Sequence, residues 1–157
     1  MLNSLTINGH MVSFDDHNPI ALRQGLTLIT GKNGRGKSTV LEMIRYALFG
    51  SRALRRPMAD YKGLSVVLEF TLKGVGYKVT RSSALTLLAT LDGTNLATGT
   101  TPVNQAVINL FGYGLAVFDI ANCCGQNQVM LFSDRMQPGD RKKLIDQTVG
   151  LSAIDDL

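Results

Sequence analysis

The stretch that decides the fold is Gly31-Lys-Asn-Gly-Arg-Gly-Lys-Ser38, which fits the pattern G-x-x-x-x-G-K-[ST] of phosphate-binding loops. The apolar and β-branched residues 26–30 stand directly before it and predict a short strand. Residues 38–49 follow it and place apolar side chains at helical spacing. Strand, glycine loop and helix form the context in which this pattern binds nucleotide phosphates. The sequence therefore predicts a nucleotide-binding site in an α/β protein.

The residue types in this loop match the demands of a triphosphate. Gly31, Gly34 and Gly36 permit positive φ and close backbone approach, so that successive N–H groups can point toward one anion. The helix that follows adds the partial positive charge of its N-terminus. We expect Lys37 to reach the β- and γ-phosphates of a nucleoside triphosphate and the Ser38 hydroxyl to join the shell of Mg²⁺. The expected cofactor-binding residues are Gly31, Asn33, Gly34, Arg35, Gly36, Lys37, Ser38 and Thr39.

Length and composition indicate a globular protein. With 157 residues, of which 45% are hydrophobic, the chain suits one domain with a real core. Its two cysteines, Cys123 and Cys124, are adjacent, which fits neither a zinc site nor an ordinary disulfide, and we expect them to fill space in a buried strand. The N-terminus does not resemble a secretion signal, and no apolar stretch is long enough for a bilayer. We expect a cytoplasmic protein without membrane contact.

The chain is mildly basic, with a net charge of +4 and a pI near 9.3. The cations gather in two groups, Arg45, Arg52, Arg55, Arg56 and Lys62 after the P-loop helix and Arg141, Lys142 and Lys143 near the C-terminus. Such groups can contact a nucleic-acid backbone, and they are equally typical of solvated loops and helix faces. Both interpretations stay open, because no aromatic interleaving accompanies the cations.

Turn residues divide the rest of the chain into short elements. Asn8-Gly9 predicts a hairpin between strands at 4–8 and 11–14. Gly50 is expected to end the P-loop helix. A meander of strands at 64–72, 77–81, 85–91 and 95–97 follows, and then a helix that opens at Thr100-Thr-Pro102.

The last part of the chain bears on catalysis. Residues 115–124 are apolar and predict a buried strand, and Gln126 follows its end. A glutamine facing the phosphates there would accept from metal-bound water and orient the attacking water. An exposed loop glutamine is the alternative, and the residues alone leave both open. A final helix is expected at 140–149.

With these motifs in place, the chain resembles the N-terminal ATPase lobe of SMC-like DNA-repair ATPases of the SbcC type and of phage recombination-endonuclease subunits. Residues 27–50 carry the G-x-N-G-x-G-K-S-T loop and the ending Ala-Leu-Phe-Gly, and residues 118–157 carry a Gly-Gln, an Arg-Lys-Lys-Leu helix and a Gly-Leu. The resemblance implies an ABC/SMC-type P-loop NTPase lobe over residues 1–157, with a mixed sheet, an antiparallel meander and the P-loop helix. It makes Gln126 the Q-loop glutamine, with Gln128 as the alternative.

The resemblance also implies a function and partners. Lys37 and Gln126 would be catalytic, and Ser38 and Gln126 would hold Mg²⁺. ATP binding and hydrolysis would be coupled to DNA end processing by an SbcD-like nuclease in repair or recombination. The further partners would be DNA, a second ATPase head in a homodimer and the protein's own C-terminal lobe beyond a coiled coil. The setting would be a bacterial cytoplasm or a phage-infected host cytoplasm.

The chain departs from the family pattern in two places. A basic residue often follows the Asn of the first hairpin, whereas this chain has Gly9, His10 and Met11, which puts a nucleotide contact there in doubt. The signature motif, Walker B aspartate and catalytic glutamate of the family belong to its C-terminal lobe. Residues 115–119 resemble a Walker B strand with Asp119 as Mg²⁺ ligand, but no carboxylate follows. We therefore expect half an active site, which alone binds ATP weakly and hydrolyses it negligibly.

Three other functions compete with this interpretation. An ABC transporter nucleotide-binding domain would share the P-loop and the Q-loop, but its serine-glycine-glycine signature is missing after Ser38. A small-molecule P-loop kinase would use Arg52, Arg55 and Arg56 as lid arginines, although the predicted meander is unusual for that class. A non-catalytic, nucleotide-dependent DNA-binding module is the third alternative.

Overall fold

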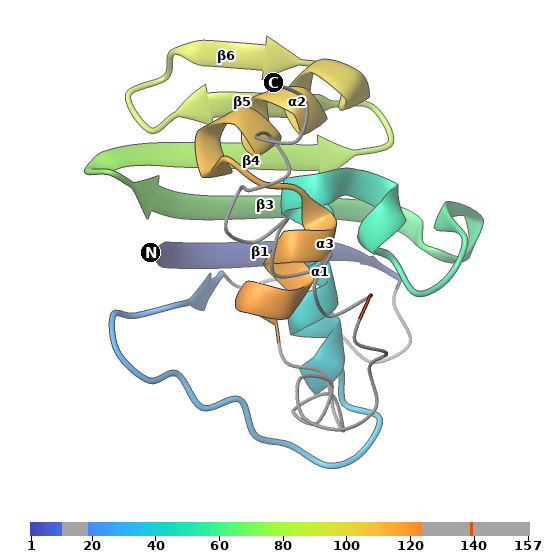
Figure 1. Cartoon of the computed structure of the whole chain (residues 1–157). Helices are drawn as coiled ribbons and strands as arrows, with labels where there is room; N and C mark the ends of the chain where they lie inside the picture. The colour runs from blue at the N-terminus through green and yellow to red at the C-terminus, as the bar shows by residue number, and fades with distance from the viewer. Residues whose placement is uncertain (11–18, 124–138, 140–157) are drawn as a thin grey trace. The chain divides into compact units, whose positions relative to one another are not determined.

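The computed structural model of the chain describes residues 1–10, 19–123 and 139 (Figure 1). The elements in order are β1 (Leu2–His10), β2 (Ile20–Ala21), α1 (Lys37–Phe49), η1 (Gly50–Ala53), η2 (Met58–Asp60), β3 (Lys62–Leu72), β4 (Val75–Ser82), β5 (Thr86–Thr90), β6 (Asn95–Thr98), α2 (Thr100–Phe111) and α3 (Leu115–Ala121). Contacts divide the chain into two compact units, Met1–Leu110 and Phe111–Leu157. The sheet, α1 and the glycine loop all belong to the first unit.

The described strands form one six-stranded sheet in the order β2-β1-β3-β4-β5-β6, and every neighbouring pair is antiparallel. The predicted meander is confirmed as β3 to β6. Its first turn uses Lys73 and Gly74, both with positive φ, at 51° and 83°. Its third turn, between β5 and β6, lies at Asp92-Gly93, where the φ of Gly93 is 98°. These left-handed conformations are the ones that short hairpin turns require.

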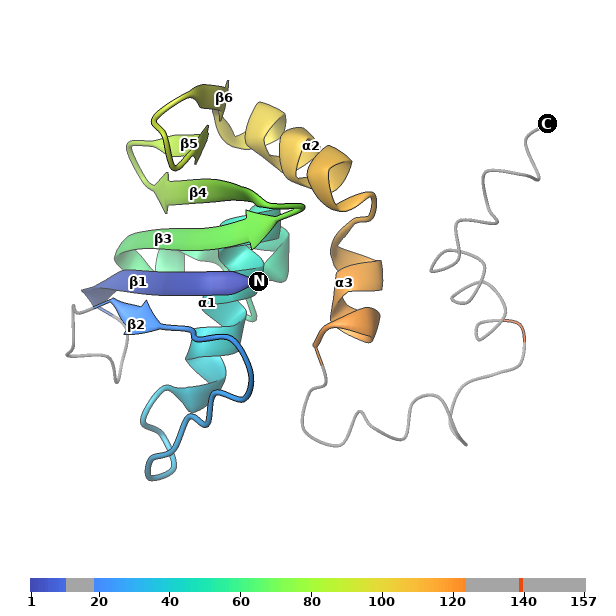
Figure 2. The same cartoon turned by 90° about the vertical axis from the view of Figure 1, so that its left-hand side faces the viewer.

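The core lies between one face of this sheet and the helices α1 and α2, which Figure 2 shows on the same side. Side chains on β3 alternate strictly, and Leu64, Val66, Leu68 and Phe70 are each at most 2% exposed. The buried side chains of α1 that face this layer include Val40, Met43, Ile44, Ala47 and Leu48, and those of α2 are Val103 and Val107. The period of two on the strand and the helical period on α1 are therefore satisfied by one shared core.

The opposite face of the sheet is polar. Ser4 Oγ donates a hydrogen bond to Glu69 Oε2 at 3.0 Å, and Lys78 Nζ lies 3.6 Å from Glu69 Oε1. These three side chains come from β1, β3 and β4, so they form one cross-strand row. Such rows add modest stability to a solvated sheet face. The alternation of apolar and polar residues thus fixes which face carries α1.

The hairpin predicted at Asn8-Gly9 is wrong. β1 continues through this dipeptide to His10 and pairs with β3, with a register shift between Asn8 and His10. Gly9 has a φ of 130°, and a Cβ atom there would lie 2.9 Å from the Gly63 carbonyl oxygen. Glycine is therefore required for a bulge and for close approach of two strands, instead of a turn. The predicted strand at 11–14 lies outside the described residues.

The strand predicted at residues 26–30 is not formed. The last antiparallel contact of this segment is the hydrogen bond from Leu22 N to Asn3 O at 2.8 Å. Beyond it the backbone has no strand assignment, and Leu26 and Leu28 are 97% and 79% exposed. A strand needs a neighbour for its ladder, and within the described part of the chain none lies beside this segment. The residue pattern is that of a buried strand, but the described residues provide no strand to pair with it.

The buried strand predicted at 115–124 is also wrong, because Leu115–Ala121 is the helix α3. Phe118 is its buried residue, and Cys123, just beyond the helix, is half-buried. A short apolar run does not distinguish a strand from a helix by its pattern. Asp119 therefore lies on a helix, and the Walker B interpretation is excluded. No single helix in the described ranges is long and apolar enough to cross a membrane, although α2 and α3 together, as a bent pair, reach that length and composition.

Candidate nucleotide-binding site

The glycine loop turns the chain into α1 with three left-handed residues. Gly31, Gly34 and Gly36 have φ values of 156°, 82° and 78°. A Cβ at Gly34 would meet no atom within 4 Å, so the glycine is needed for its backbone conformation and not for space. Gly36 is the N-cap of α1, and its carbonyl accepts from the N–H of Thr39 at 2.9 Å and of Val40 at 3.2 Å. The glycines thus do locally what the sequence predicts.

The start of α1 has an uncompensated positive end. Within the part of the chain that the structure describes, no side chain caps it, and its first turn holds no acidic residue. Most surface helices place Ser, Asp or Glu at these positions, because the first N–H groups have no partner inside the helix. The N–H groups of Thr39 and Val40 already donate to the Gly36 carbonyl. The N–H groups of α1 before Thr39 have no partner among the described residues, and the helix dipole favours an anion at the same place.

Lys37 is folded back onto the loop. Its Nζ donates to the carbonyl oxygen of Gly31 at 2.8 Å and to that of Lys32 at 2.9 Å. These two bonds tie the first residues of the loop to the first residue of the helix. An ammonium group has three donors, so one remains for a phosphate oxygen, and a bound anion also competes for the other two. Lys37 therefore connects the start of the loop to the start of α1, and its contact with the β- and γ-phosphates stays a prediction.

The other expected ligands lie in the glycine loop and the first turn of α1. Asn33, Arg35 and Ser38 are exposed, and Thr39 is half-buried in the first turn of α1. Among the described residues no cluster of three His, Cys, Asp or Glu side chains exists that would hold a metal by itself. The Ser38 hydroxyl can join the shell of Mg²⁺ beside a bound nucleotide, and this role stays a prediction. The second expected ligand, Gln126, and its alternative Gln128 lie outside the described residues.

A buried arginine at the far end of α1 is not predicted by the sequence. Arg81 on β4 is 2% exposed. Its Nε donates to Ala47 O at 2.6 Å, and its Nη2 donates to Leu48 O at 3.1 Å and to Asn104 Oδ1 at 2.7 Å. Burial lowers the pKa of this guanidinium to about 10. Its signal in the sequence is its place in the alternation of β4, two residues after the buried Val79.

A buried carboxylate on α1 is likewise not predicted. Glu42 is 5% exposed, and its Oε1 accepts from the backbone N–H of Arg55 at 2.7 Å and from the Tyr61 hydroxyl at 2.6 Å. The Arg55 Nε lies 3.9 Å from Glu42 Oε2. Burial, and secondarily the hydrogen bond to Glu42, raise the pKa of Tyr61. In the sequence, Glu42 and Tyr61 look like ordinary surface residues.

With this geometry described, comparison with known proteins identifies the family. A protein-family model described as an AAA domain matches residues 4–156. The chain belongs to this family. The chain is 26% identical over 143 residues to the DNA double-strand break repair Rad50 ATPase of Thermoplasma volcanium, covering 83% of this chain and 16% of the relative. It is 28% identical over 149 residues to that of Nanoarchaeum equitans, covering 85% and 18%.

Two further similarities bear on the type of ATPase. The SbcC component of the nuclease SbcCD of Vibrio cholerae is 33% identical over 121 residues, covering 59% of this chain and 12% of the relative. A solved structure described as structural biochemistry of ATP-driven dimerization and DNA-stimulated activation of SMC ATPases matches with a TM-score of 0.63 at 19% identity. This match covers 93% of this chain and 98% of that one, and it shows the fold. The predicted resemblance to SbcC-type, SMC-like ATPases is confirmed, and the chain spans less than a fifth of these curated relatives.

Proposed function

We propose that this chain is the ATP-binding N-terminal part of an SMC-like ATPase that acts in DNA repair or recombination. The observation that carries the proposal is the start of α1, which no described side chain caps. It follows three glycines with positive φ, and its first residue, Lys37, donates to two carbonyls of the glycine loop. Family membership and the Rad50 and SbcC relatives support it. The loop by itself would suit many nucleotides, and the relatives favour ATP.

The residues of the loop would divide the work of binding. The first N–H groups of α1 would bind phosphate oxygens, and Lys37 would exchange its bonds to the Gly31 and Lys32 carbonyls for bonds to the β- and γ-phosphates. Ser38 and, beyond the described residues, Gln126 would hold Mg²⁺, which would neutralise charge on the phosphates. No described residue near the loop is placed as a general base. This part of the protein would therefore bind ATP without completing its hydrolysis.

The segment before the loop supports pairing with a further lobe. Leu26 and Leu28 are largely exposed, although they lie just before the candidate site. We propose that the protein's own C-terminal lobe pairs with residues 26–30 and supplies the Walker B aspartate and the catalytic glutamate. A second head, an SbcD-like nuclease and DNA would complete the assembly. The chain covers at most 18% of the length of these two Rad50 relatives, which supports a longer parent protein.

A small-molecule kinase is the weaker alternative. Its lid would have to move over the phosphates, whereas Arg55 is held through its backbone N–H by Glu42 on α1. The antiparallel meander β3–β6 after the P-loop helix is also uncommon in that class. These two observations favour the ATPase.

Hydrolysis assays test the proposal. The full-length protein should hydrolyse ATP and should do so faster with DNA, whereas the 157-residue chain alone should show turnover at the background level of its Lys37→Ala variant. The reason is that in-line attack needs groups on both sides of the γ-phosphate. Robust, Lys37-dependent turnover by the isolated chain would refute the half-site proposal. Transfer of the γ-phosphoryl group from ATP to a small-molecule acceptor, giving ADP and a phosphorylated product, would favour the kinase.

A further inference from the structure

We infer that residues 51–62, here called the arginine loop, are a binding surface for the phosphate backbone of double-stranded DNA, supported directly by the P-loop helix. This inference rests on the proposed function and deepens it by placing the DNA surface on the molecule. Three features of the described structure carry it, namely the charge of the loop, its support and the side chains that it lacks.

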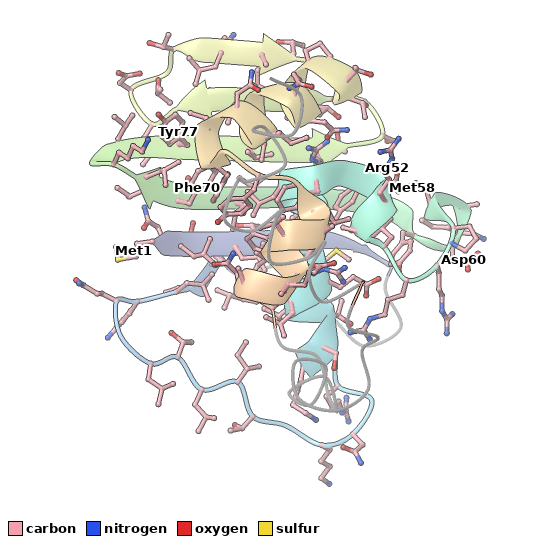
Figure 3. All side chains as sticks on the ribbon, viewed as in Figure 1. Met1, Arg52, Met58, Asp60, Phe70 and Tyr77 are labelled. Atoms are coloured by element: carbon pink, nitrogen blue, oxygen red, sulfur yellow. The ribbon has the colours of Figure 1, made fainter. Side chains whose placement is uncertain are left out.

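The arginine loop presents cations to solvent. Its four basic side chains, Arg52, Arg55, Arg56 and Lys62, are all exposed, and its single carboxylate is Asp60. Figure 3 shows Arg52, Met58 and Asp60 together, on the opposite side of the view from Met1. Four cations against one anion on a twelve-residue loop give a local excess of positive charge. Contacts to DNA phosphates come mainly from such side chains.

The loop is also held in one shape from beneath. Two points along it meet at one buried atom, because Glu42 Oε1 accepts from the Arg55 N–H and from the Tyr61 hydroxyl. Ala53, which is 2% exposed, anchors the loop in the core between Arg52 and Arg55. Hydrogen bonds to a buried carboxylate are stronger than those between neutral groups. A solvated basic loop needs no such support, whereas a binding surface gains affinity from being ordered in advance.

The side chains that the loop lacks distinguish duplex DNA from other acidic ligands. Protein interfaces depend on buried aromatic and apolar anchors, and the only large exposed apolar side chain of the loop is Met58, at 37%. Single-stranded DNA is bound by stacking its bases on aromatic rings. The one aromatic residue of the loop, Tyr61, is half-buried and donates its hydroxyl to Glu42. Exposed guanidinium groups without stacking rings fit the outer backbone of a duplex.

The carboxylate that holds the arginine loop, Glu42, lies on α1, the helix that also begins at the candidate nucleotide site. Glu42 lies four residues after Ser38, which is one turn along α1. The buried end of the contact is therefore rigidly connected to the helix whose first N–H groups face the phosphates. DNA bound to the arginine loop would therefore be connected through Glu42 to the same helix that binds ATP.

A binding experiment with a short fluorescent DNA duplex tests this inference. Anisotropy titrations of the full-length protein would compare wild type with Arg52→Gln/Arg56→Gln and with a matched control, Lys73→Gln/Lys78→Gln, which removes two exposed cations from the β3–β4 hairpin. We expect the loop variant to bind about tenfold more weakly and to lower the salt dependence by about two ion equivalents, since each lost phosphate contact removes roughly 0.9 from the slope. The control should change affinity by less than about twofold.

Two further variants separate anchoring from charge. Glu42→Gln removes a negative charge, and from charge alone we would expect it to bind DNA more tightly. If Glu42 anchors the loop, we expect it to bind DNA about threefold more weakly, because fewer molecules hold the loop in the conformation that binds. Tyr61→Phe leaves the net charge unchanged and removes one hydrogen bond to the same oxygen. If Glu42→Gln does not fold by circular dichroism, Tyr61→Phe decides, and its expected effect has the same direction.

The possible results are distinct. Selective weakening by the loop variant, together with weaker binding by the anchor variants, supports the inference. The inference would be overturned if both double variants bound the duplex equally weakly, or if the loop variant bound it as tightly as wild type. It would also be overturned if Glu42→Gln bound the duplex more tightly, or if wild-type protein bound an acidic protein and no duplex. ATP binding is measured on the same samples to separate this inference from the proposed function. If only the DNA surface is wrongly assigned, wild-type protein still binds ATP. Wild-type protein that binds duplex but no ATP would instead contradict the proposed function.

Discussion

At the scale of single residues, Arg81 shows how a buried cation is accommodated without a carboxylate. Its three donated hydrogen bonds go to the carbonyls of Ala47 and Leu48 and to Asn104 Oδ1. The two carbonyls belong to the last turn of α1, where the helix carries partial negative charge. The C-terminal end of the P-loop helix thus supplies the counter-charge, and the side chain ties β4, α1 and α2 together. The lowered pKa of about 10 indicates that this compensation for burial is incomplete.

The substitution Arg81→Lys tests this arrangement. An ammonium group lacks the planar fork that reaches all three acceptors, so we expect the free energy of unfolding to fall by about 1–3 kcal/mol. Urea denaturation measures the change. Arg23→Lys is the matched control, because Arg23 is exposed, and it should alter stability by less than about 0.5 kcal/mol. Equal stability of Arg81→Lys and wild type would show that the three hydrogen bonds contribute nothing.

At the scale of elements, what the sequence predicts depends on whether the cause is local. The hairpins of the meander are predictable because Lys73-Gly74 and Asp92-Gly93 make their own turns. The same kind of signal fails at Asn8-Gly9, where the glycine is needed for the approach of Gly63 from a strand more than fifty residues later. The prediction for residues 26–30 fails for a related reason, since a strand is defined by a neighbour. Contacts distant in sequence, including those of Glu42, leave no local pattern.

The end of α1 gives a prediction about an element boundary. Gly50 has a φ of 76°, and a Cβ there would lie 3.2 Å from Asn104 Oδ1 and 3.4 Å from Arg81 Nη1. We expect Gly50→Ala to destabilise the protein by about 1–2 kcal/mol, from backbone strain and from disturbance of the arginine contacts. Gly114→Ala is the control, because Gly114 has a φ of −97° and open space around its Cβ position. In thermal unfolding, Gly50→Ala should melt at a clearly lower temperature than Gly114→Ala. Similar melting temperatures would contradict the requirement for glycine at position 50.

The anchor between α1 and the arginine loop predicts a response to alkaline pH. The pKa of Tyr61 is raised above its ordinary value of 10.0, first by burial and then by Glu42. A raised pKa means that the folded state favours the protonated phenol, so its contribution to stability is complete below about pH 10 and is lost as the pH rises further. Urea unfolding at a series of pH values should therefore show a smaller alkaline loss of stability in Tyr61→Phe than in wild type. Parallel curves for the two proteins would contradict a role for Tyr61 ionisation.

At the scale of the whole molecule, the described residues form the phosphate-binding part of the candidate site and do not complete it. The sheet and α1 fix the glycine loop, while residues 26–30 before it have no strand beside them among the described residues, and Leu26 and Leu28 are exposed. The conformation of the loop is predictable from its eight residues because its causes are local. Its completion is predicted only through resemblance to a family, since the groups that would activate water are not close in this sequence. The central claim is therefore one of binding.

Binding of fluorescent ATP in the presence of Mg²⁺ tests that claim most directly. The full-length protein would be titrated alongside Lys37→Ala and, as a matched control, Lys32→Ala, which removes a neighbouring exposed cation of the same loop. We expect wild type to bind the nucleotide saturably and Lys37→Ala to lose at least about tenfold in affinity, because a charge-assisted bond to phosphate is removed. Lys32→Ala should change the affinity by less than about threefold. Wild-type protein that does not bind the nucleotide, or Lys37→Ala that binds it as tightly as Lys32→Ala, would contradict the account.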